Sequence, residues 1–232
     1  WPQALSTMAR TAGHLAEAQG LLDELAELDL QALQAPAPFS WLSLPSLPLA
    51  PLLCLSAARQ RNLLRYWLAP LTPLPDSEHW AGWECLAHAA PDAKPVWQLA
   101  QGEMHRADGR LWWLSGEWLQ PPAVVGFVLP PNQWLVLPGN GRVMLRGQAA
   151  PQALQVRYRQ GGERLQLAQR GHRDLKRLLN ELGVPAFVRG RLPLLYDDQR
   201  LLGVANLPSL SASAHAAWQF IWQPPTSDQG LS

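Results

Sequence analysis

Cysteine and charged residues are both scarce in this 232-residue chain. Only two cysteines are present, Cys54 and Cys85, too few for a disulfide framework or a cysteine-rich metal site. We therefore expect a reducing, cytoplasmic compartment. Charged residues make up 16% of the chain against 47% hydrophobic residues, and this balance excludes an intrinsically disordered chain because it supplies enough apolar surface for a core.

Catalytic and metal-binding motifs are missing as well. The glycines at 139, 141, 161 and 162 lack the Lys-Ser/Thr pair that follows a phosphate-binding loop. The histidines are scattered, without the His-Glu-x-x-His spacing of a zinc site, and no Cys-x-x-Cys pair occurs. No serine lies in a nucleophile-elbow pattern. The sequence therefore predicts no metal site and no self-contained active site.

Two stretches without any charged residue, 30–58 and 118–141, are long enough to suggest membrane segments. Each contains five prolines, and proline removes the backbone donors that a spanning helix needs in lipid. We interpret both stretches as packed loops or linkers and expect no membrane association. The first ten residues show no secretory signal, and the start at Trp1 in mid-pattern indicates a piece of a longer protein.

Positive charge is concentrated in the last third of the chain. Between Arg157 and Arg191 nine basic residues face three acids, whereas residues 1–150 have more acids than bases. Arginine dominates this window, and its planar guanidinium suits contacts with phosphate groups. The alternative is a solvated face that keeps the protein soluble. Our candidates for RNA backbone contacts in this window are Arg157, Arg159, Arg164, Arg173, Lys176, Arg177, Arg189 and Arg191.

A second basic cluster consists of Arg59, Arg61 and Arg65. It is a weaker candidate for RNA contact, since helix solubility or salt bridges between domains explain it slightly better. His172 lies inside the basic window, where it could contact a base or a phosphate, although a solvated role is the simpler explanation.

Periodicity predicts the secondary structure. Apolar spacings of three and four residues predict helices over 5–28, 56–68, 76–89 and 171–182, with N-caps at Ser56 and Asp76. Alternating segments predict strands at 96–100, 103–105, 110–114, 134–137, 142–145, 154–159, 192–196, 200–205 and 218–222. Trp97, Trp112 and Trp113 lie in such segments and are expected to fill a core rather than stack on bases.

These patterns predict an α+β fold in two parts. The first part is mostly helical with a small β appendage, and the second is a small basic α+β domain of short strands around one helix. We expect a helix over 1–34, a domain over 35–116, a proline-rich linker with a short hairpin over 117–150, and the basic domain over 151–232.

Two sets of motifs resemble a known family. The first set resembles the substrate-binding domain of bacterial tRNA(Ile)-lysidine synthase: residues 55–68, Pro73-Leu74-Pro75, and Arg106-x-x-Gly109-x-Leu111. The second set is similar to the C-terminal domain of that enzyme: 156–159, 161–164, 175–177, 183–185, and Arg189-x-Arg191 followed by 192–196. Together they cover most of 50–115 and 150–223.

The resemblance implies an ATP-dependent ligase that joins lysine to the wobble cytidine of the isoleucine tRNA with a CAU anticodon. In that family, catalysis resides in an N-terminal domain with a Ser-Gly-Gly-x-Asp-Ser loop, and this loop is absent here. The resemblance therefore implies that ATP with Mg²⁺ and lysine bind a missing catalytic domain, from which the helix over 1–34 leads, and that this chain alone is inactive and holds no cofactor.

The implied task of this chain is tRNA recognition, chiefly through the acceptor stem. Its implied partners are the isoleucine tRNA and the enzyme's own catalytic domain, and a homodimer stays open. Two other functions remain: a protein-interaction module without nucleic-acid contact, and a complete enzyme of another class, which the missing catalytic motifs disfavour.

Overall fold

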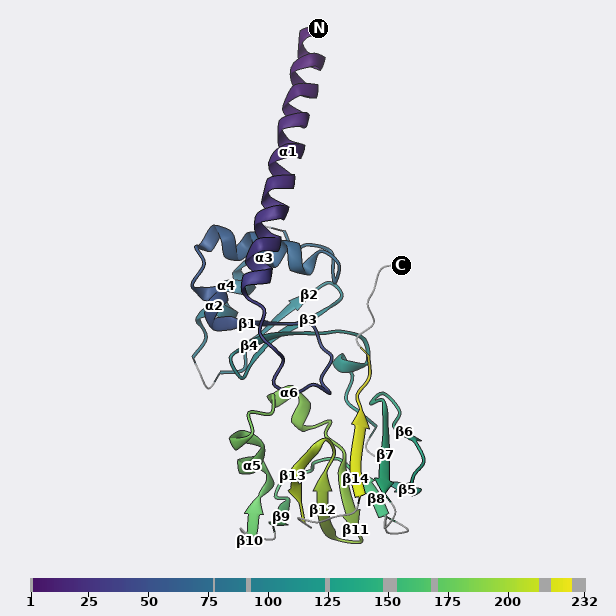
Figure 1. Cartoon of the computed structure of the whole chain (residues 1–232). Helices are drawn as coiled ribbons and strands as arrows, with labels where there is room; N and C mark the ends of the chain where they lie inside the picture. Colours follow the sequence, from purple (N-terminus) through teal and green to yellow (C-terminus); the bar gives the residue numbers. More distant parts are fainter. Residues whose placement is uncertain are drawn as a thin grey trace. The chain divides into compact units, whose positions relative to one another are not determined.

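The computed structural model describes residues 2–76, 78–90, 93–123, 126–147, 154–167, 171–212 and 218–226. These residues form two compact units (Figure 1). The first unit comprises residues 2–36 and Pro45–Trp113, and the second comprises Ala37–Leu44 and residues 114–226. Each unit mixes helices with small antiparallel sheets, which agrees with the expected mixture of α and β structure.

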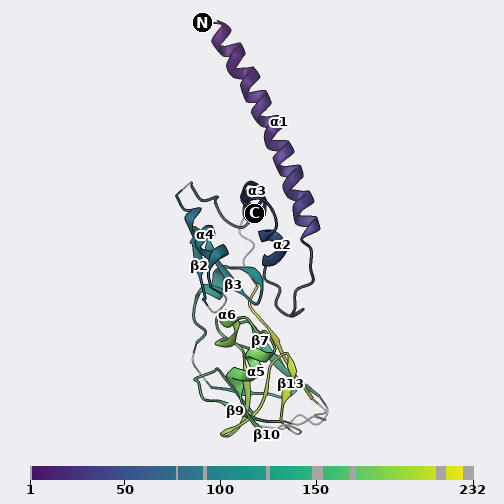
Figure 2. The same cartoon turned by 90° about the vertical axis from the view of Figure 1, so that its left-hand side faces the viewer.

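The first unit begins with α1, a 31-residue helix over Pro2–Ala32 that is longer than the expected 5–28. Its C-terminal part lies against α3, which spans Ala57–Leu68. Asn62 of α3 donates to the Leu22 carbonyl at 2.6 Å. The N-terminal part of α1 extends away from the other elements of the first unit (Figure 2). Apolar side chains there, among them Leu5 and Met8, are exposed.

A four-stranded sheet supports the helices of the first unit. Its strand order is β1-β4-β3-β2, with β1 at Ser46–Pro48, β2 at Val96–Leu99, β3 at Gly102–Ala107 and β4 at Arg110–Leu114. Strand β1 and helix α2, at Leu49–Leu53, come from the uncharged stretch expected to be loop. That expectation was wrong because Leu47, Leu49 and Leu52 are buried and need regular structure to pair their backbone groups.

The predicted helix caps have different outcomes. Ser56 caps α3 as expected, its hydroxyl accepting the N–H of Arg59 at 3.5 Å. Helix α4 spans Ala81–His88, so it begins five residues after Asp76. The Asp76 carboxylate accepts the N–H groups of Glu78 and His79, and it therefore closes a turn ahead of the helix.

Tryptophans fill the core of the first unit. Trp83, Trp97 and Trp113 are buried together with leucines of α2 and α3, and Trp112 is buried as well, as predicted for the three strand tryptophans. Gly82 allows this packing, since a Cβ there would lie 2.2 Å from the Trp97 ring.

The second unit contains two sheets. Five antiparallel strands have the order β13-β12-β11-β8-β5, with β5 at Phe127–Leu129, β8 at Leu154–Arg157, β11 at Leu194–Asp197, β12 at Arg200–Val204 and β13 at Leu207–Ser211. Three further strands have the order β14-β7-β6, with β6 at Leu135–Val136, β7 at Arg142–Gly147 and β14 at Trp218–Gln223. The segment 117–150, expected to be a proline-rich linker with a short hairpin, contains β6 and β7 as an antiparallel pair where the hairpin was predicted. It also supplies β5 and most of the short 3-10 helix η1 at Gly116–Leu119, which were not predicted.

A hairpin and two short helices complete the second unit. Strands β9, at Arg164–Leu167, and β10, at Gly171–Asp174, pair antiparallel, and helices α5 and α6 follow at Leu175–Glu181 and Ala186–Arg189. The predicted helix over 171–182 was therefore wrong in its first four residues. Gly171 has a φ of +65°, and Asp174 is the N-cap of α5, which leaves 171–174 extended against β9.

Arg191 lies at the centre of the second unit and is only 5% exposed. Its Nη1 donates to the Gly139 carbonyl at 3.0 Å and to Asn140 Oδ1 at 3.2 Å, and its Nη2 donates to the carbonyls of Glu117 and Gln120. The guanidinium also lies over the Trp118 ring, 5.2 Å from its centroid. Burial lowers the pKa of Arg191. One side chain thus joins η1 to the β6–β7 turn.

The same turn is held by Asn140, which is fully buried. Its Nδ2 donates to the Tyr158 hydroxyl at 3.1 Å and to the Arg191 carbonyl at 2.9 Å, while its own carbonyl accepts the Trp222 indole N–H at 2.8 Å. Gly141 follows with a φ of +71°, and a Cβ there would lie 2.0 Å from the Gln223 carbonyl. Only glycine fits this position.

Two surface properties follow from the described residues. Both cysteines are free and exposed. No helix within the described ranges combines the length and the apolar character needed to cross a membrane.

Candidate nucleic-acid interface

Six basic side chains gather on one part of the second unit. On the paired strands β9 and β10, Arg164 is the partner of Asp174 and His172 is the partner of Gln166. Arg173 follows His172 in β10, and Arg200 begins β12, a strand that contacts β9. Helix α5 adds two more. We call this set the basic surface; its residues, all exposed, are Arg164, His172, Arg173, Lys176, Arg177 and Arg200.

The register of the β9–β10 hairpin explains part of this arrangement. His172 is paired with Gln166, and Asp174 with Arg164, so these four side chains share one face of the hairpin. In α5, Leu175, Leu178 and Leu179 are buried. The helical period then turns Lys176 and Arg177 outward.

Two adjoining hollows run across the basic surface and share Arg164 and His172. The larger, of about 640 Å³, is also lined by Arg173, Asp174 and Arg177. The smaller, of about 400 Å³, extends to Gln199 and Arg200 at the start of β12. Glu181 also lines the larger hollow, so an extended anionic ligand that follows both hollows would meet four guanidinium groups and two carboxylates, those of Asp174 and Glu181.

The cations of the basic surface are free to bind such a ligand. Within the described ranges, none of its arginines or Lys176 forms an ion pair with a carboxylate. Asp174 is occupied as the cap of α5, accepting the N–H of Arg177 at 3.0 Å. Arg200 has only a long contact to Gln166, at 3.4 Å. Unpaired guanidinium groups offer forked donors that match phosphate oxygens.

Four of the eight candidates from the predicted window lie outside the basic surface. Arg191 is buried, as described above, so it is not accessible to a phosphate. Arg157 is half-buried, lies 4.8 Å over the Tyr196 ring and donates to Gln155 at 2.7 Å. Arg189 is half-buried and donates to the Val184 carbonyl at 2.6 Å and to Asn180.

The fourth, Arg159, is paired with Glu163 at 3.2 Å. Burial opposes the ionisation of Glu163, but the N–H groups of Gly161 and Gln160 and the Arg159 side chain outweigh it and lower the pKa of this carboxyl. Glu163 therefore stays charged and closes the turn before β9. Arg159 supports the hairpin in this way rather than facing solvent as a free cation.

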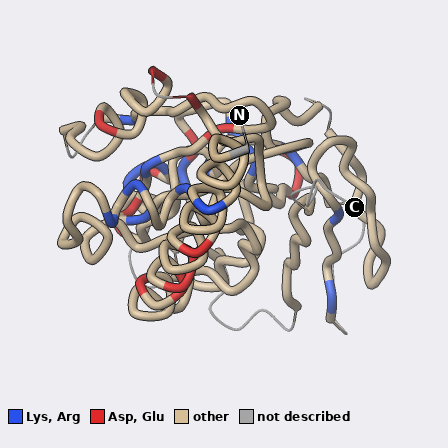
Figure 3. Tube along the Cα trace, turned by 90° about the horizontal axis from the view of Figure 1, so that it is seen from above, with Lys and Arg blue, Asp and Glu red and all other residues tan. Residues whose placement is uncertain are grey.

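The second predicted cluster is mostly engaged within the first unit. Arg59 forms an ion pair with Asp29 of α1, and Arg65 forms one with Asp23. Figure 3 colours the basic and acidic residues of the described chain along the trace. Arg61 is exposed and has no ion pair among the described residues. Arg59 and Arg65 thus fit the salt-bridge explanation better than an RNA surface, with both pairs lying between helices of one unit. For Arg61, RNA contact stays a prediction.

Sequence reasoning missed Arg200 altogether. It lies nine residues beyond the basic window and reaches the hairpin only because β12 lies beside β9. The signal that could have found it is the turn at Asp197 and Asp198, which returns β12 antiparallel to β11. His172, singled out as uncertain, is one of the two residues shared by the two hollows.

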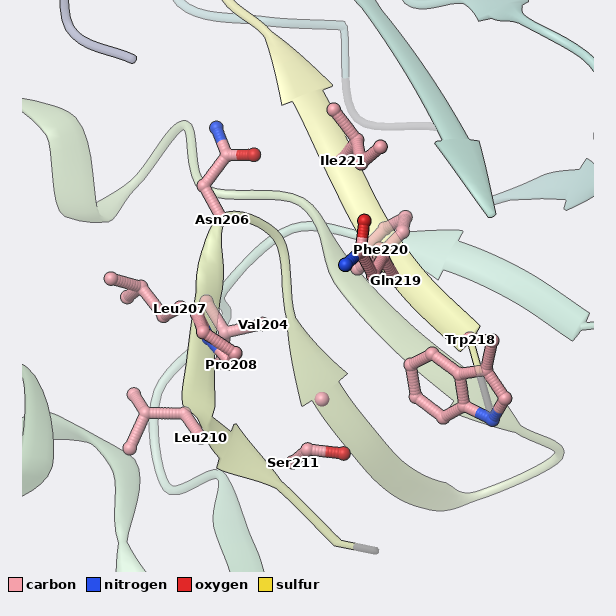
Figure 4. A pocket seen from close by; sticks show the side chains of 11 residues that line it. Val204, Asn206, Leu207, Pro208, Leu210, Ser211, Trp218, Gln219, Phe220 and Ile221 are labelled. Atoms are coloured by element: carbon pink, nitrogen blue, oxygen red, sulfur yellow. The ribbon is translucent and has the colours of Figure 1, made fainter. Parts of the chain in front are cut away.

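A further hollow of about 390 Å³ lies between β13 and β14 (Figure 4). Trp218 and Ser211 lie near one end of it and Asn206 near the other. The described residues that line it are uncharged. It therefore offers hydrogen bonds and an aromatic face, but no cation for a phosphate group.

Comparison with known proteins matches both units to one enzyme family. Residues 47–112 match the family described as TilS substrate binding domain, and residues 154–222 match TilS substrate C-terminal domain. The chain belongs to the tRNA(Ile)-lysidine synthase (TilS) family. The basic surface lies entirely within the TilS C-terminal domain match.

Curated TilS relatives align with the whole chain. The tRNA(Ile)-lysidine synthase of Pseudomonas fluorescens is 58% identical over 231 residues, which cover 100% of this chain and 52% of the relative. The Escherichia coli O157:H7 enzyme is 32% identical over 238 residues, which cover 96% of this chain and 53% of the relative. The chain thus spans about half the length of the curated relatives it matches. A crystal structure of a TilS C-terminal domain matches 43% of this chain and 98% of its own length at 26% identity, with a TM-score of 0.35.

Proposed function

We propose that this chain is the tRNA-recognition portion of a tRNA(Ile)-lysidine synthase, and that the basic surface binds the RNA backbone. The observation that carries the proposal is that Arg164, Arg173, Arg177 and Arg200 line two adjoining hollows of the second unit, exposed and without an ion pair to any described carboxylate. A-form RNA is recognised largely through phosphates and 2′-hydroxyls, and arginine suits the phosphates.

The proposed substrate is the isoleucine tRNA with a CAU anticodon, which the whole enzyme modifies by joining lysine to the wobble cytidine. A tRNA whose anticodon loop closely resembles another's must be distinguished through contacts elsewhere on the molecule. A basic surface outside the catalytic domain can provide such contacts by fixing the position of a stem.

ATP with Mg²⁺ and lysine belong, in this proposal, to the half of the relatives' length that lies outside this chain. The residues present do not fit them. The sequence lacks a Ser-Gly-Gly-x-Asp-Ser loop, and the described residues bring no three His, Cys, Asp or Glu side chains together in a geometry that could hold a metal ion.

The proposal is tested by binding of this chain to the fluorescently labelled isoleucine tRNA, followed by anisotropy over a series of salt concentrations, with the methionine elongator tRNA as competitor. We expect binding that weakens steeply with salt, since each phosphate contact adds about 0.7 to 0.9 to the slope of log affinity against log salt. A preference for the isoleucine tRNA is the expected discrimination.

Absence of binding to either tRNA at low salt, with the chain folded by circular dichroism, would contradict the proposal. Self-association that is insensitive to salt, without RNA binding, would instead favour the protein-interaction module. Sedimentation of the same samples distinguishes these two results.

A further inference from the structure

Arg110 is the first residue of β4 in the first unit and is only 8% exposed. Its Nε and Nη2 donate to the Ser46 hydroxyl at 3.2 Å and 3.1 Å, and Nη2 also lies 3.5 Å from the Ala35 carbonyl. The guanidinium carbon is 5.8 Å from the centroid of the Trp112 ring. Every one of these partners is electrically neutral.

The charge of Arg110 is therefore poorly compensated. Among the described residues no carboxylate pairs with it, in contrast to Arg59 and Arg65, which each face an aspartate. The carbonyl end of α1 near Ala35 supplies only about half a negative charge. Burial lowers the pKa of Arg110, with no acid to oppose the effect. A buried cation in this state gains strongly from an incoming anion.

Arg106, on the neighbouring strand β3, engages the terminal nitrogen that has no acceptor in Arg110. Its Nη1 donates to three carbonyls at the end of α4, those of Leu86, Ala87 and Ala89, at 3.2, 3.2 and 2.8 Å. Within the described residues, Nη1 of Arg110 has no such acceptor. Arg110 thus retains donors that a ligand can use.

A hollow of about 570 Å³ lies beside Arg110. Apart from Arg110, the described residues that line it are uncharged, and they include Gln34, Ser46 and Trp67. The hollow is large enough for a phosphate group. Its wall offers two polar side chains, Gln34 and Ser46, that can donate to the phosphate oxygens, and one cation, Arg110. No acid on its wall would repel an anion.

We propose that Arg110 binds a backbone phosphate of RNA in this hollow, as an anion site in the first unit separate from the basic surface of the second. The inference rests on the proposed function, because RNA is the polyanion that the chain is proposed to meet. It is carried by an independent observation, the buried arginine without a counter-charge.

The test follows the side-chain Nε–H resonance of Arg110 by NMR in the 232-residue chain, assigned by its disappearance in Arg110→Lys. Arg106→Lys assigns the matched control resonance. One titration uses inorganic phosphate and a second uses a short RNA stem-loop. We expect the Arg110 resonance to shift saturably with each ligand while the Arg106 resonance stays in place, and we expect Arg110→Gln to reduce the salt slope of tRNA affinity by about one.

A shift with inorganic phosphate alone would overturn the RNA assignment and leave a site for free phosphate. No shift with either ligand would overturn the anion site altogether. These results are distinguishable from failure of the proposed function, in which the RNA binds nowhere on the chain; RNA binding with an unmoved Arg110 resonance contradicts this inference only. Both titrations observe the unsubstituted chain, and the two lysine variants, which keep the positive charge, serve only for assignment.

Discussion

Replacing Arg191 with methionine is expected to destabilise the second unit by at least about 3 kcal/mol. The substitution removes the donors to four oxygens of η1 and the β6–β7 turn, and buried carbonyls left without a partner each cost about 1 to 3 kcal/mol. It also removes the cation over the Trp118 ring. The free energy of unfolding, from urea titration followed by tryptophan fluorescence, measures the effect.

Arg173→Met is the matched control, because it makes the same chemical change at an exposed position of the basic surface. We expect it to leave the unfolding free energy within about 0.5 kcal/mol of the unsubstituted chain and to weaken tRNA binding. The opposite pattern, a stable Arg191→Met variant with lost tRNA affinity, would show that Arg191 is an RNA contact and that its place in the fold is secondary.

The double substitution Arg173→Glu, Arg177→Glu is expected to weaken tRNA binding by on the order of 100-fold or more at low salt. Both side chains are exposed and line the larger hollow. A hydrogen bond to a charged group contributes about 1.5 to 3 kcal/mol, and each 1.4 kcal/mol is tenfold in affinity. The slope of log affinity against log salt should fall by about two. Anisotropy with the labelled tRNA measures both quantities.

Its control is Arg10→Glu, Arg146→Glu, which makes the same change in net charge at exposed positions on α1 and β7. We expect a much smaller loss of affinity from this variant, because neither residue lines the two hollows of the basic surface. Equal losses from the two double variants would mean that only net charge matters and that the basic surface has no special role.

The sequence predicted elements that depend on local spacing. The Ser56 cap and the leucine stripe of α3 were readable because residues three and four apart share a helix face. The alternating segments around Trp97 and Trp113 likewise predicted buried strands. The start of α5 was misplaced, since 171–174 contains no apolar alternation and becomes a strand only through pairing with β9.

The arginine window predicted the region of the candidate site but not which arginines face solvent. Arg191 is buried through contacts with residues distant in sequence, such as its hydrogen bond to Asn140, 51 positions away. No local pattern contains that contact. Arg200 enters the basic surface through strand contact at a similarly long range, 36 residues from Arg164. Charge clustering identifies a segment, whereas exposure depends on tertiary packing.

The central claim is that RNA binds the β9–β10 hairpin, α5 and the start of β12. Hydrogen–deuterium exchange of this chain with and without the isoleucine tRNA tests it most directly, because it locates the contact without any substitution. We predict slowed exchange over 164–167, 171–177 and 200–201, and unchanged exchange at 155–157. Slowed exchange confined to 57–65, or none in the second unit while the tRNA is bound, would contradict the account.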